Sequence, residues 1–398
     1  MLSNNYTEKL IDLKGVKVKN IIQSEKITTI EMEMELREQH CPCCGAATRT
    51  VHDYRAQPIR DIPAFGKEII LLLRKRRYRC KECNKRFFEQ NTFLPRFHRM
   101  TNRLSSYVIS KLHDTCSFTS VARDIGLSVT TVIRIFDLVE YAPSQLPAVL
   151  SIDEFKGNTN KEKYQCIITD PLNHRVLDIL PDRQKHHLTS YFKGFDRSST
   201  TFFVSDMWST YEDISLTYFK NATFIVDKYH CIRQVIWAFE AVRKEEQKKF
   251  ARDRRIYFKH SRKLLLKSHN SLTNDEKQQI NVMLFASEKL LVAYSLKESF
   301  FEFMHSKNSQ EARPKLSDWV MDAGNSSLHR FATCAKTMSN WSVGILNSFD
   351  FPYTNGFTEG ANNKIKVLKR NAYGYRNFYR FRNRILHMFS QKNLSKAG

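Results

Sequence analysis

Two short apolar runs in the middle of the chain each end at an aspartate. The run 149–152 leads into Asp153, and the run 201–205 leads into Asp206. Short apolar runs with β-branched and aromatic members are typical of buried strands. We therefore expect a sheet in which these two strands pair, so that the two carboxylates become neighbours.

The sequence around these runs predicts a sheet with helices between some of its strands. We expect strands at 149–152, 164–169, 175–180, 201–205 and 222–226, and helices at about 187–195 and 208–218. The order β-β-β-α-β-α-β is that of a ribonuclease-H-like α/β core. Asp153 and Asp206 are separated by 206 − 153 = 53 residues. This length accommodates the elements expected between them, which are two strands, a helix and a third strand.

A third carboxylate, Glu359, opens a strongly basic segment. Residues 355–398 contain ten Lys or Arg and this single acid. On a helix, Asn363 and Lys366 share the face of Glu359, and both are expected to bind DNA. A charge-balancing partner for a nearby cation is one interpretation, although exposed ion pairs contribute little stability. The other is that Glu359 completes an Asp–Asp–Glu set able to hold two divalent ions for phosphodiester chemistry.

The same basic segment has the composition of a nucleic-acid-binding surface. Cations that can grip phosphates alternate with aromatic rings that can stack on bases. The cations are Lys366, Lys369, Arg370, Arg376 and Arg380, and the aromatic residues are Tyr373, Tyr375, Phe378 and Tyr379.

The overall charge supports a polyanionic partner. Lys and Arg number 64 against 41 Asp and Glu, which gives a formal charge of +23. A charge of this size favours salt-sensitive binding to nucleic acid, but does not separate DNA from RNA or an anionic membrane. No apolar run approaches the roughly 20 residues of a membrane span. The first residues lack the long apolar stretch of a signal peptide. We expect a soluble, cytoplasmic, nucleoid-associated protein with no membrane partner.

Two C-x-x-C pairs predict a structural zinc site. Cys41 and Cys44 follow one strand-like run, and Cys80 and Cys83 follow another. Four thiolates at such knuckles are typical of a zinc ribbon and leave no open position for catalysis. Cys43 is an additional thiol that could replace one ligand, and a pair of ordinary buried thiols is the alternative interpretation.

Residues 118–136 have the pattern of a helix-turn-helix. One amphipathic helix ends at Gly126, and Ser128 can cap a second helix that buries Val132, Ile133 and Phe136. The second helix of such a unit enters the DNA major groove. A plain three-helix packing unit is the alternative. The residues expected to face DNA are Thr130, Thr131 and Arg134.

From about 229 to 350 the periodicity is helical. Asp206 and Glu359 are separated by 359 − 206 = 153 residues. A helical insertion in the core would explain this long separation. Eleven Lys or Arg between 243 and 267 are interpreted as a solvated face. Trp237, Trp319 and Trp341 are candidates for stacking on a distorted base, although aromatic residues in helices more often lie in the core.

Five motifs together resemble one protein family, over nearly the whole chain and in the family's order. They are Cys41-Pro-Cys-Cys44 with Cys80-Lys-Glu-Cys83, Ser151-Ile-Asp153-Glu-Phe, Val204-Ser-Asp206-Met-Trp, Val226-Asp227-Lys-Tyr-His230, and Thr354-Asn-Gly-Phe-Thr-Glu359-Gly-Ala-Asn-Asn-Lys. The family is that of the bacterial insertion-sequence transposases called ISL3.

The resemblance implies a DDE transposase with Asp153, Asp206 and Glu359 as ligands of two Mg²⁺ (or Mn²⁺) ions. Magnesium also suits carboxylate and phosphate oxygens on chemical grounds. Asp227 and His230 resemble a D-x-x-H motif that helps to order such sites. An N-terminal helix cap with an exposed histidine is an equally good interpretation of these two residues.

The resemblance further implies hydrolysis of a phosphodiester at each element end, followed by attack of the freed 3′-OH on target DNA. The expected partners are double-stranded DNA, as terminal inverted repeats and target, and a second copy of the chain in a homodimer or larger assembly. A non-catalytic DNA-binding regulator, a structure-selective nuclease on the same core and a decayed transposase are the competing hypotheses.

The expected fold is a multidomain α+β chain whose ribonuclease-H-like catalytic core is interrupted by an all-helical insertion. The zinc-ribbon module is placed at 1–98 and the helix-turn-helix at 99–142. The core is placed at 148–232 and 351–390, and the insertion at 233–350.

Overall fold

The computed structural model describes residues 5–95, 98–159 and 162–390. The chain forms two compact units. The first comprises the residues up to Tyr141 together with Val367–Gly374, and the second comprises Ala142–Lys366 and the residues from Tyr375 onward. Each unit is described by itself.

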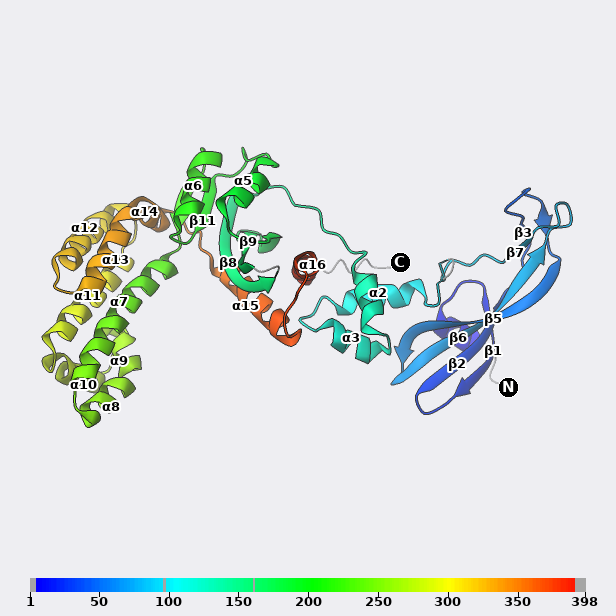
Figure 1. Ribbon diagram of the computed structural model, residues 1–398, viewed down its shortest axis with the longest axis horizontal. Helices are drawn as coiled ribbons and strands as arrows, with labels where there is room; N and C mark the ends of the chain where they lie inside the picture. The colour runs from blue at the N-terminus through cyan, green and yellow to red at the C-terminus, as the bar shows by residue number, and fades with distance from the viewer. Residues whose placement is uncertain (1–4, 96–97, 160–161, 391–398) are drawn as a thin grey trace. The chain divides into compact units, whose positions relative to one another are not determined.

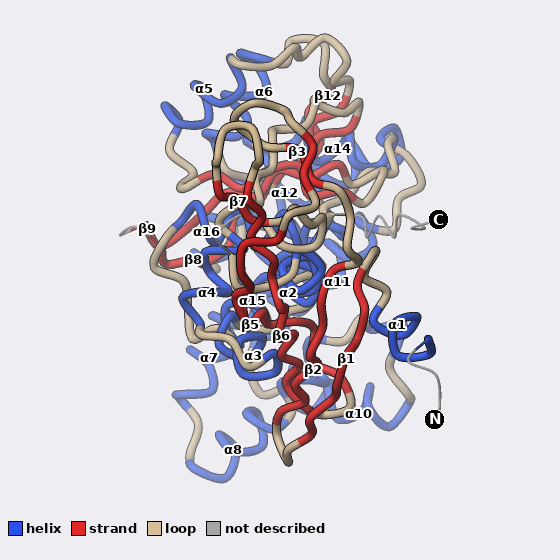
Figure 2. The backbone as a smooth tube through the Cα atoms, turned by 90° about the vertical axis from the view of Figure 1, so that its right-hand side faces the viewer, coloured by secondary structure: helices blue, strands red, loops and turns tan. Residues whose placement is uncertain are grey.

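The first unit contains a five-stranded sheet (Figures 1 and 2). Its strands lie in the order β1-β2-β6-β5, with β7 paired to the distal part of β6. Apolar residues that alternate along the strands form a core around Met32, Leu71 and Leu73, because successive side chains of a strand point to opposite faces of the sheet. The elements are α1 Asn5–Ile11, β1 Val16–Gln23, β2 Ile27–Met34, β5 Val51–Ala64, β6 Lys67–Arg79 and β7 Arg86–Phe88.

Strands β5 and β6 form a long antiparallel pair whose far end carries the cysteine knuckles. Cys80 directly follows β6. Cys41 and Cys44 lie between the short paired strands β3 Gln39–His40 and β4 Ala47–Thr48. The two knuckles therefore belong to the same end of the unit.

Three helices follow: α2 Asn102–Lys111, α3 Phe118–Ile125 and α4 Val129–Phe136. Ser128 caps α4 by accepting a backbone N–H hydrogen bond, as predicted, and Thr101 caps α2 in the same way. Gly126 has a left-handed φ of 74° at the end of α3, a conformation that glycine adopts without penalty. One detail of the prediction is wrong: α4 buries Ile135 instead of Ile133, because positions three and four residues after Val132 share its helix face.

The second unit is built on a five-stranded sheet in the order β10-β9-β8-β11-β12. Strand β9 is antiparallel to β8 and β10, whereas β8, β11 and β12 are parallel. The strands are β8 Val149–Thr159, β9 Glu162–Asp170, β10 Arg175–Leu180, β11 Phe202–Ser205 and β12 Thr223–Val226. Each predicted strand is present, and β8 extends seven residues beyond the predicted Ile152 (159 − 152 = 7).

Helices α5 Lys185–Lys193 and α6 Ser209–Tyr218 connect β10, β11 and β12 in sequence. After the helices that follow β12, α15 Gly356–Asn371 and α16 Phe378–Phe389 complete the described chain. Helix α16 packs against β10, and the Arg382 side chain donates to Asp178 over 2.6 Å. Tyr375 and Phe378, predicted to stack on bases, are buried at 8% and 4% exposure, so this part of the prediction is wrong.

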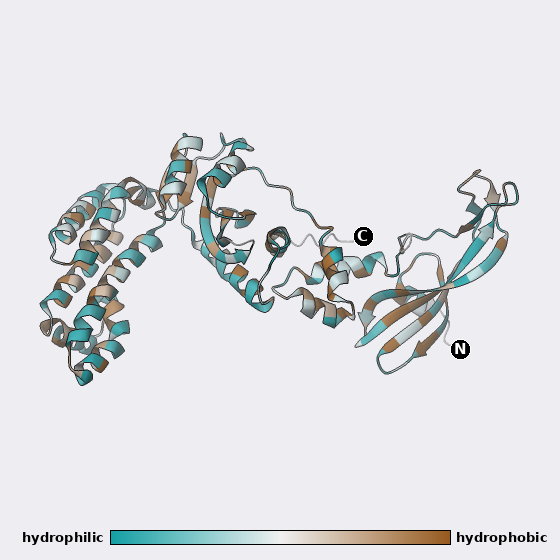
Figure 3. Ribbon diagram, viewed as in Figure 1, coloured by the Kyte–Doolittle hydropathy of each residue, from teal (hydrophilic) through white to brown (hydrophobic). Residues whose placement is uncertain are grey.

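Between β12 and α15 the chain is helical (Figure 1). Figure 3 shows hydrophilic and hydrophobic residues along each of these helices, as amphipathic helices require. Trp319 is 1% exposed and donates to the Leu296 carbonyl, so it is a core residue, whereas Trp237 is 55% exposed. The helices are α7 Lys228–Lys249, α8 Arg252–His260, α9 Arg262–Leu266, η1 His269–Ser271, α10 Asn274–Phe285, α11 Glu288–Met304, α12 Ser309–Asn325, α13 His329–Asn340 and α14 Ser342–Asp350.

Within the described parts of the chain, none of the helices combines the length and hydrophobicity needed to cross a lipid bilayer.

Candidate active site

The parallel strands of the second unit align three aspartates. Val204 pairs with Ser151 of β8 and with Ile225 of β12. Continuing this register by two residues sets Asp206 level with Asp153 on one side and Asp227 on the other. The predicted neighbourhood of Asp153 and Asp206 therefore follows from strand register.

Asp153, Glu154 and Asp206 form a compact acidic cluster. One carboxylate oxygen from each lies within 4.8 Å of the others. Desolvation raises the pKa of Asp153 to about 7, with a further contribution from the Asp206 charge. Desolvation likewise raises the pKa of Asp206 to about 7, and the charge of Glu154 adds to the shift. These carboxylates repel one another, which makes a cation between them favourable.

The donor set fits a hard divalent cation. Asp206 Oδ1 is buried and has no hydrogen-bond partner among the described residues. A buried carboxylate oxygen without a donor is destabilising unless a cation or ligand satisfies it. Carboxylate oxygens are the ligands that Mg²⁺ prefers in proteins.

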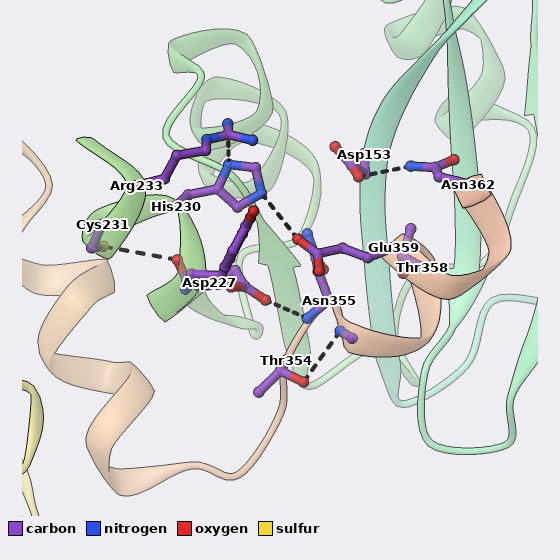
Figure 4. Close-up of polar contacts among 12 residues, drawn as sticks. Asp153, Asp227, His230, Cys231, Arg233, Thr354, Asn355, Thr358, Glu359 and Asn362 are labelled. Atoms are coloured by element: carbon purple, nitrogen blue, oxygen red, sulfur yellow. Dashed lines mark hydrogen bonds and ion pairs between the residues drawn. The ribbon is translucent and has the colours of Figure 1, made fainter. Parts of the chain in front are cut away.

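Glu359 lies in the first turn of α15, beside the cluster and not in it (Figure 4). Its Oε1 is 4.0 Å from His230 Nε2, and its side chain is 37% exposed. Desolvation raises the pKa of Glu359, the charge of Asp227 adds to the shift, and the charges of Arg233 and Lys366 oppose it. The structure thus brings Glu359 close enough to Asp153 for its charge to add to the raised pKa of that carboxyl group, while Glu154 is the third member of the tight group.

His230 connects Glu359 to Arg233. Arg233 Nη2 lies 2.9 Å from His230 Nδ1, and because a guanidinium only donates, Nδ1 must accept. The imidazole proton is therefore on Nε2, the atom that faces Glu359 (Figure 4). Desolvation and the Arg233 charge lower the pKa of His230 to about 4, so the ring is neutral at physiological pH.

Asp227, which directly follows β12, accepts hydrogen bonds from the N-terminal ends of α7 and α15. Its Oδ1 accepts the Tyr229 backbone N–H over 2.7 Å as the N-cap of α7. Its Oδ2 accepts the Asn355 backbone N–H over 2.6 Å, one residue before α15 begins. The N-cap interpretation of Asp227 is therefore confirmed, but His230 is buried at 6% exposure and not an exposed helix-start residue.

Buried polar contacts hold the start of α15 against the sheet. Ser151 Oγ donates to Asn355 Oδ1 over 2.6 Å and lies 2.9 Å from Thr358 Oγ1. Thr169 Oγ1 lies 2.7 Å from the same Thr358 hydroxyl. Because these groups are buried, their hydrogen bonds strongly favour one position of the helix.

Asn362 makes the direct contact between α15 and the acidic cluster. Its side-chain amide donates to Asp153 Oδ2 over 2.9 Å (Figure 4). Sequence reasoning did not select Asn362, although its position three residues after Glu359 places both on one helix face.

Glu154 is held by residues that sequence reasoning also missed. Arg183 Nη1 donates to Glu154 Oε1 over 2.7 Å, and the Tyr211 hydroxyl lies 3.5 Å from Oε2. The Arg183 guanidinium stacks over the Trp208 ring at 4.5 Å. The signal that could have found Glu154 is its position next to Asp153; Arg183 has no comparable signal in the sequence.

In the first unit, the four predicted cysteines form a second ligand group. The Sγ atoms of Cys41, Cys44, Cys80 and Cys83 lie within 4.8 Å of one another. The Cys41–Cys83 and Cys44–Cys80 sulfur distances are both 3.5 Å, close to the about 3.8 Å edge of a tetrahedral Zn–S₄ site. Cys43 is exposed and outside the group.

Hydrogen bonds around Cys41 also favour a metal-binding thiolate. Desolvation raises the pKa of the Cys41 thiol, but backbone hydrogen bonds from Cys44 and Cys43 outweigh it and lower the pKa to about 6. Metal binding requires the thiolate, so Cys41 is suited to ligate a structural zinc ion.

The residues expected to contact DNA lie mostly at the surface. Thr130 and Arg134 of α4 are exposed and Thr131 is half-buried, with both threonine hydroxyls hydrogen-bonded to Ser128 Oγ. Asn363, Lys366, Arg370 and Arg376 are exposed, and Lys369 is half-buried.

Comparison with known protein families gives three matches along the chain. A family model described as a transposase matches residues 150–385. A model described as the zinc-finger of transposase IS204/IS1001/IS1096/IS1165 matches residues 37–83. A model described as the helix-turn-helix domain of transposase family ISL3 matches residues 89–139.

Individual relatives agree with these matches. The transposase for insertion sequence element IS1001 of Bordetella parapertussis is 28% identical over 396 residues, covering 94% of this chain and 96% of that protein. The transposase for IS1557 of Mycobacterium tuberculosis is 23% identical over 256 residues, covering 57% of this chain and 56% of that protein. A Lactococcus lactis protein named ATP-dependent protease is 33% identical over 107 residues, which cover 27% of this chain and 33% of that protein.

The acidic cluster, the two amino-terminal modules and these matches define a transposase. Because the transposase model covers more than half of the sequence, the chain belongs to the ISL3 family of transposases. The zinc-ribbon match, together with the four clustered cysteines, supports a structural zinc ion.

Proposed function

We propose that this chain is a DDE transposase that binds the terminal inverted repeats of its insertion sequence, cleaves the DNA at their ends and joins the 3′-OH to target DNA. The observation that carries the proposal is the position of three carboxylates around one strand, β8. Asp153 lies on β8, Asp206 directly follows β11 at the same level, and Asn362 connects the helix of Glu359 to Asp153.

A ribonuclease-H-like core is the fold that we propose for the second unit. Its support is the strand order β10-β9-β8-β11-β12, with two antiparallel pairings on one side of β8 and parallel strands on the other. On this basis 148–232 and 351–390 form the core, and 233–350 form a helical insertion. For the first unit we propose a zinc-ribbon module at 1–98 and a helix-turn-helix at 99–142.

Asp153, Asp206 and Glu359 are the proposed ligands of two Mg²⁺ ions, for which Mn²⁺ could substitute. When bound, such ions would activate the attacking oxygen and stabilise the leaving oxygen in an in-line displacement. The chain's own residues have supporting roles. Asn362 orients Asp153, Asp227 fixes the start of α15, and the His230 Nε2–H faces Glu359. Such outer contacts set the orientation of metal ligands.

The proposed reaction needs no protein nucleophile. Water attacks the phosphodiester at the element end and leaves a free 3′-OH, which then attacks a target phosphodiester at the same site. Arg183 neutralises Glu154, so that the cluster carries less negative charge toward the DNA.

Thr130, Thr131 and Arg134 are proposed to read the repeat, and Asn363, Lys366, Lys369, Arg370 and Arg376 to bind DNA phosphates. Joining two ends requires at least a dimer on DNA.

Cleavage of a labelled fragment tests this proposal. The fragment carries the inverted repeat that flanks the gene, and the products are resolved on a sequencing gel with Mg²⁺ present. Wild type should cut at the repeat boundary and leave a 3′-OH. Glu359→Gln and Asp206→Asn should still bind the repeat but cut at least about 100-fold more slowly.

Glu302→Gln is the matched control, because Glu302 is exposed on α11 and far in sequence from the acidic cluster. Its rate should equal that of wild type. Tight repeat binding without cleavage by wild type would instead indicate a regulator or a decayed copy, and the catalytic assignment would be withdrawn.

A further inference from the structure

Helix α7 presents an arginine between two exposed aromatic rings, close to the acidic cluster. Tyr229 is 52% exposed and Trp237 is 55% exposed. The Arg233 guanidinium lies 5.7 Å from the centre of the Tyr229 ring and 4.9 Å from that of Trp237. Residues spaced by four on a helix share one face, so the three side chains form a continuous row.

The positive charge of Arg233 has no carboxylate partner. Among the described residues its side chain makes a single hydrogen bond, from Nη2 to His230 Nδ1 over 2.9 Å, and no ion pair. Since Nδ1 accepts, the histidine is neutral and does not cancel or share the charge. A guanidinium has five N–H donors. The Nε–H of Arg233 is buried without a partner, so the donors that remain for a ligand are those of the two terminal nitrogens, Nη1 and Nη2.

Arg183 provides a contrast within the same unit. It is also stacked on aromatic rings, 4.5 Å from Trp208 and 4.9 Å from Tyr164. Its guanidinium, however, is paired with Glu154 over 2.7 Å. The charge of Arg183 is therefore balanced inside the protein, and that of Arg233 is available to a ligand.

We infer that Arg233 binds a phosphate of the DNA strand that enters the acidic site, with Tyr229 and Trp237 holding its guanidinium in place. The inference rests on the proposed function. The guanidinium plane matches a phosphate with two parallel hydrogen bonds. Two rings that restrict its motion reduce the entropy lost on binding. Exposed rings beside it favour a nucleotide strand over free phosphate, since bases can stack on them.

The location explains why a cation is needed there. The charge of Arg233 acts on Asp206 and Glu359, where it opposes the desolvation that raises the pKa of both carboxyl groups. A DNA phosphate that approaches these carboxylates meets repulsion, and an unpaired arginine at their margin offsets it.

A substrate series with single neutral methylphosphonates tests the contact. Each labelled repeat-end fragment carries one such replacement at a phosphate near the cleavage position. Binding is measured by fluorescence anisotropy without added divalent ions, and cleavage is measured with Mg²⁺. In wild type, one replacement should weaken binding and slow cleavage by roughly 10- to 100-fold, the range for a charge-assisted hydrogen bond.

Arg233→Gln should show this loss on the unmodified fragment and no additional loss with the sensitive methylphosphonate. Arg233→Lys should keep part of the sensitivity, because it keeps the charge without the planar donor set. Trp237→Ala should weaken binding by roughly 10-fold. Lys244→Ala is the control: Lys244 is exposed on the same helix, and this variant should show the wild-type methylphosphonate profile.

If the losses caused by Arg233→Gln and by the sensitive methylphosphonate added together, the variant would show the same methylphosphonate profile as wild type. That result would overturn the inference and leave Arg233 only the role of orienting His230. The inference would also be overturned if Arg233→Lys and Lys244→Ala behaved alike. Failure of the proposed function would look different. Wild type would then not cleave at all, and the binding series without divalent ions would still decide whether Arg233 contacts the DNA.

Discussion

The side-chain amide of Asn362 donates to Asp153 Oδ2 over 2.9 Å and so joins α15 to β8 across 209 residues of sequence. Asn362 lies three residues after Glu359, on the same side of the helix. The contact therefore fixes the rotation of α15 and with it the direction of Glu359. One hydrogen bond thus couples the positions of two carboxylates that come from distant parts of the chain.

Replacement of Asn362 by alanine should reduce activity without abolishing repeat binding. The change removes the donor to Asp153 and leaves Oδ2 of a buried carboxylate without its partner. Loss of such a ligand-orienting contact lowers metal affinity or activity by about 10- to 100-fold. The Mg²⁺ concentration that gives half-maximal cleavage should rise accordingly.

The control for this experiment is Asn281→Ala, an exposed position on α10. Its cleavage rate and Mg²⁺ dependence should match wild type. Equal Mg²⁺ dependence of Asn362→Ala and wild type would show that the amide does not orient Asp153.

Several parts of this fold could be predicted from sequence because their causes are local. The apolar runs before Asp153 and Asp206 identified two neighbouring strands, and hydrogen bonding between parallel strands set their register. Ser128 was recognised as a cap, because a short polar side chain before an apolar helical pattern satisfies the first N–H groups.

The membership of the acidic cluster could not be predicted in the same way. A helical period gives the face on which Glu359 lies but not the element that this face contacts. The contacts that decide it come from Asn362 and from the Ser151–Thr358 pair, both across more than 200 residues. For the same reason Tyr375 was expected at a DNA surface although it packs on Phe381, with ring centres 4.6 Å apart.

The contribution of Asp153 and Asp206 to the stability of the metal-free protein should decrease as pH rises from about 4 to 7. Desolvation raises the pKa of Asp153 and Asp206 to about 7, whereas unfolded carboxyl groups titrate near about 4. Between these values the folded state holds protons that the unfolded chain has lost, so unfolding releases protons and becomes easier with increasing pH. Mg²⁺ should restore stability at pH 8, because a bound cation stabilises the ionised carboxylates.

Thermal unfolding of wild type and Asp206→Asn isolates this effect from the other titrating groups. The quantity to compare is the melting temperature of the variant minus that of wild type. Without divalent ions, this difference should increase by roughly 4–8 °C between pH 5 and pH 8. Mg²⁺ should raise the melting temperature less in the variant. Asp318→Asn, at an exposed position of α12, should follow wild type at every pH. A difference that does not change with pH would mean that Asp206 titrates normally.

Zinc content should depend on four cysteines and not on the fifth. Cys44→Ser removes a sulfur that lies 3.5 Å from both Cys80 Sγ and Cys83 Sγ, and it should abolish stoichiometric zinc. Cys43→Ser should retain one zinc per chain, because Cys43 is exposed and outside the cluster. Metal analysis of the two purified variants measures this directly. Zinc loss from Cys43→Ser, or zinc retained at full occupancy by Cys44→Ser, would require a different ligand set.

Replacing each of two helical glycines by alanine should change the free energy of unfolding in opposite directions. A Cβ at Gly344 of α14 would lie 2.8 Å from Val226 Cγ2 and 2.9 Å from Phe224 Cδ1, both part of β12. These neighbours are buried and cannot move aside, so Gly344→Ala should destabilise the second unit by about 1–3 kcal/mol. A Cβ at Gly324 of α12 would meet no atom within 4 Å, and there alanine should stabilise by up to about 1 kcal/mol through helix propensity. Chemical denaturation of both variants measures the two signs. If Gly344→Ala were as stable as wild type, α14 would not pack on the sheet as closely as the structure has it.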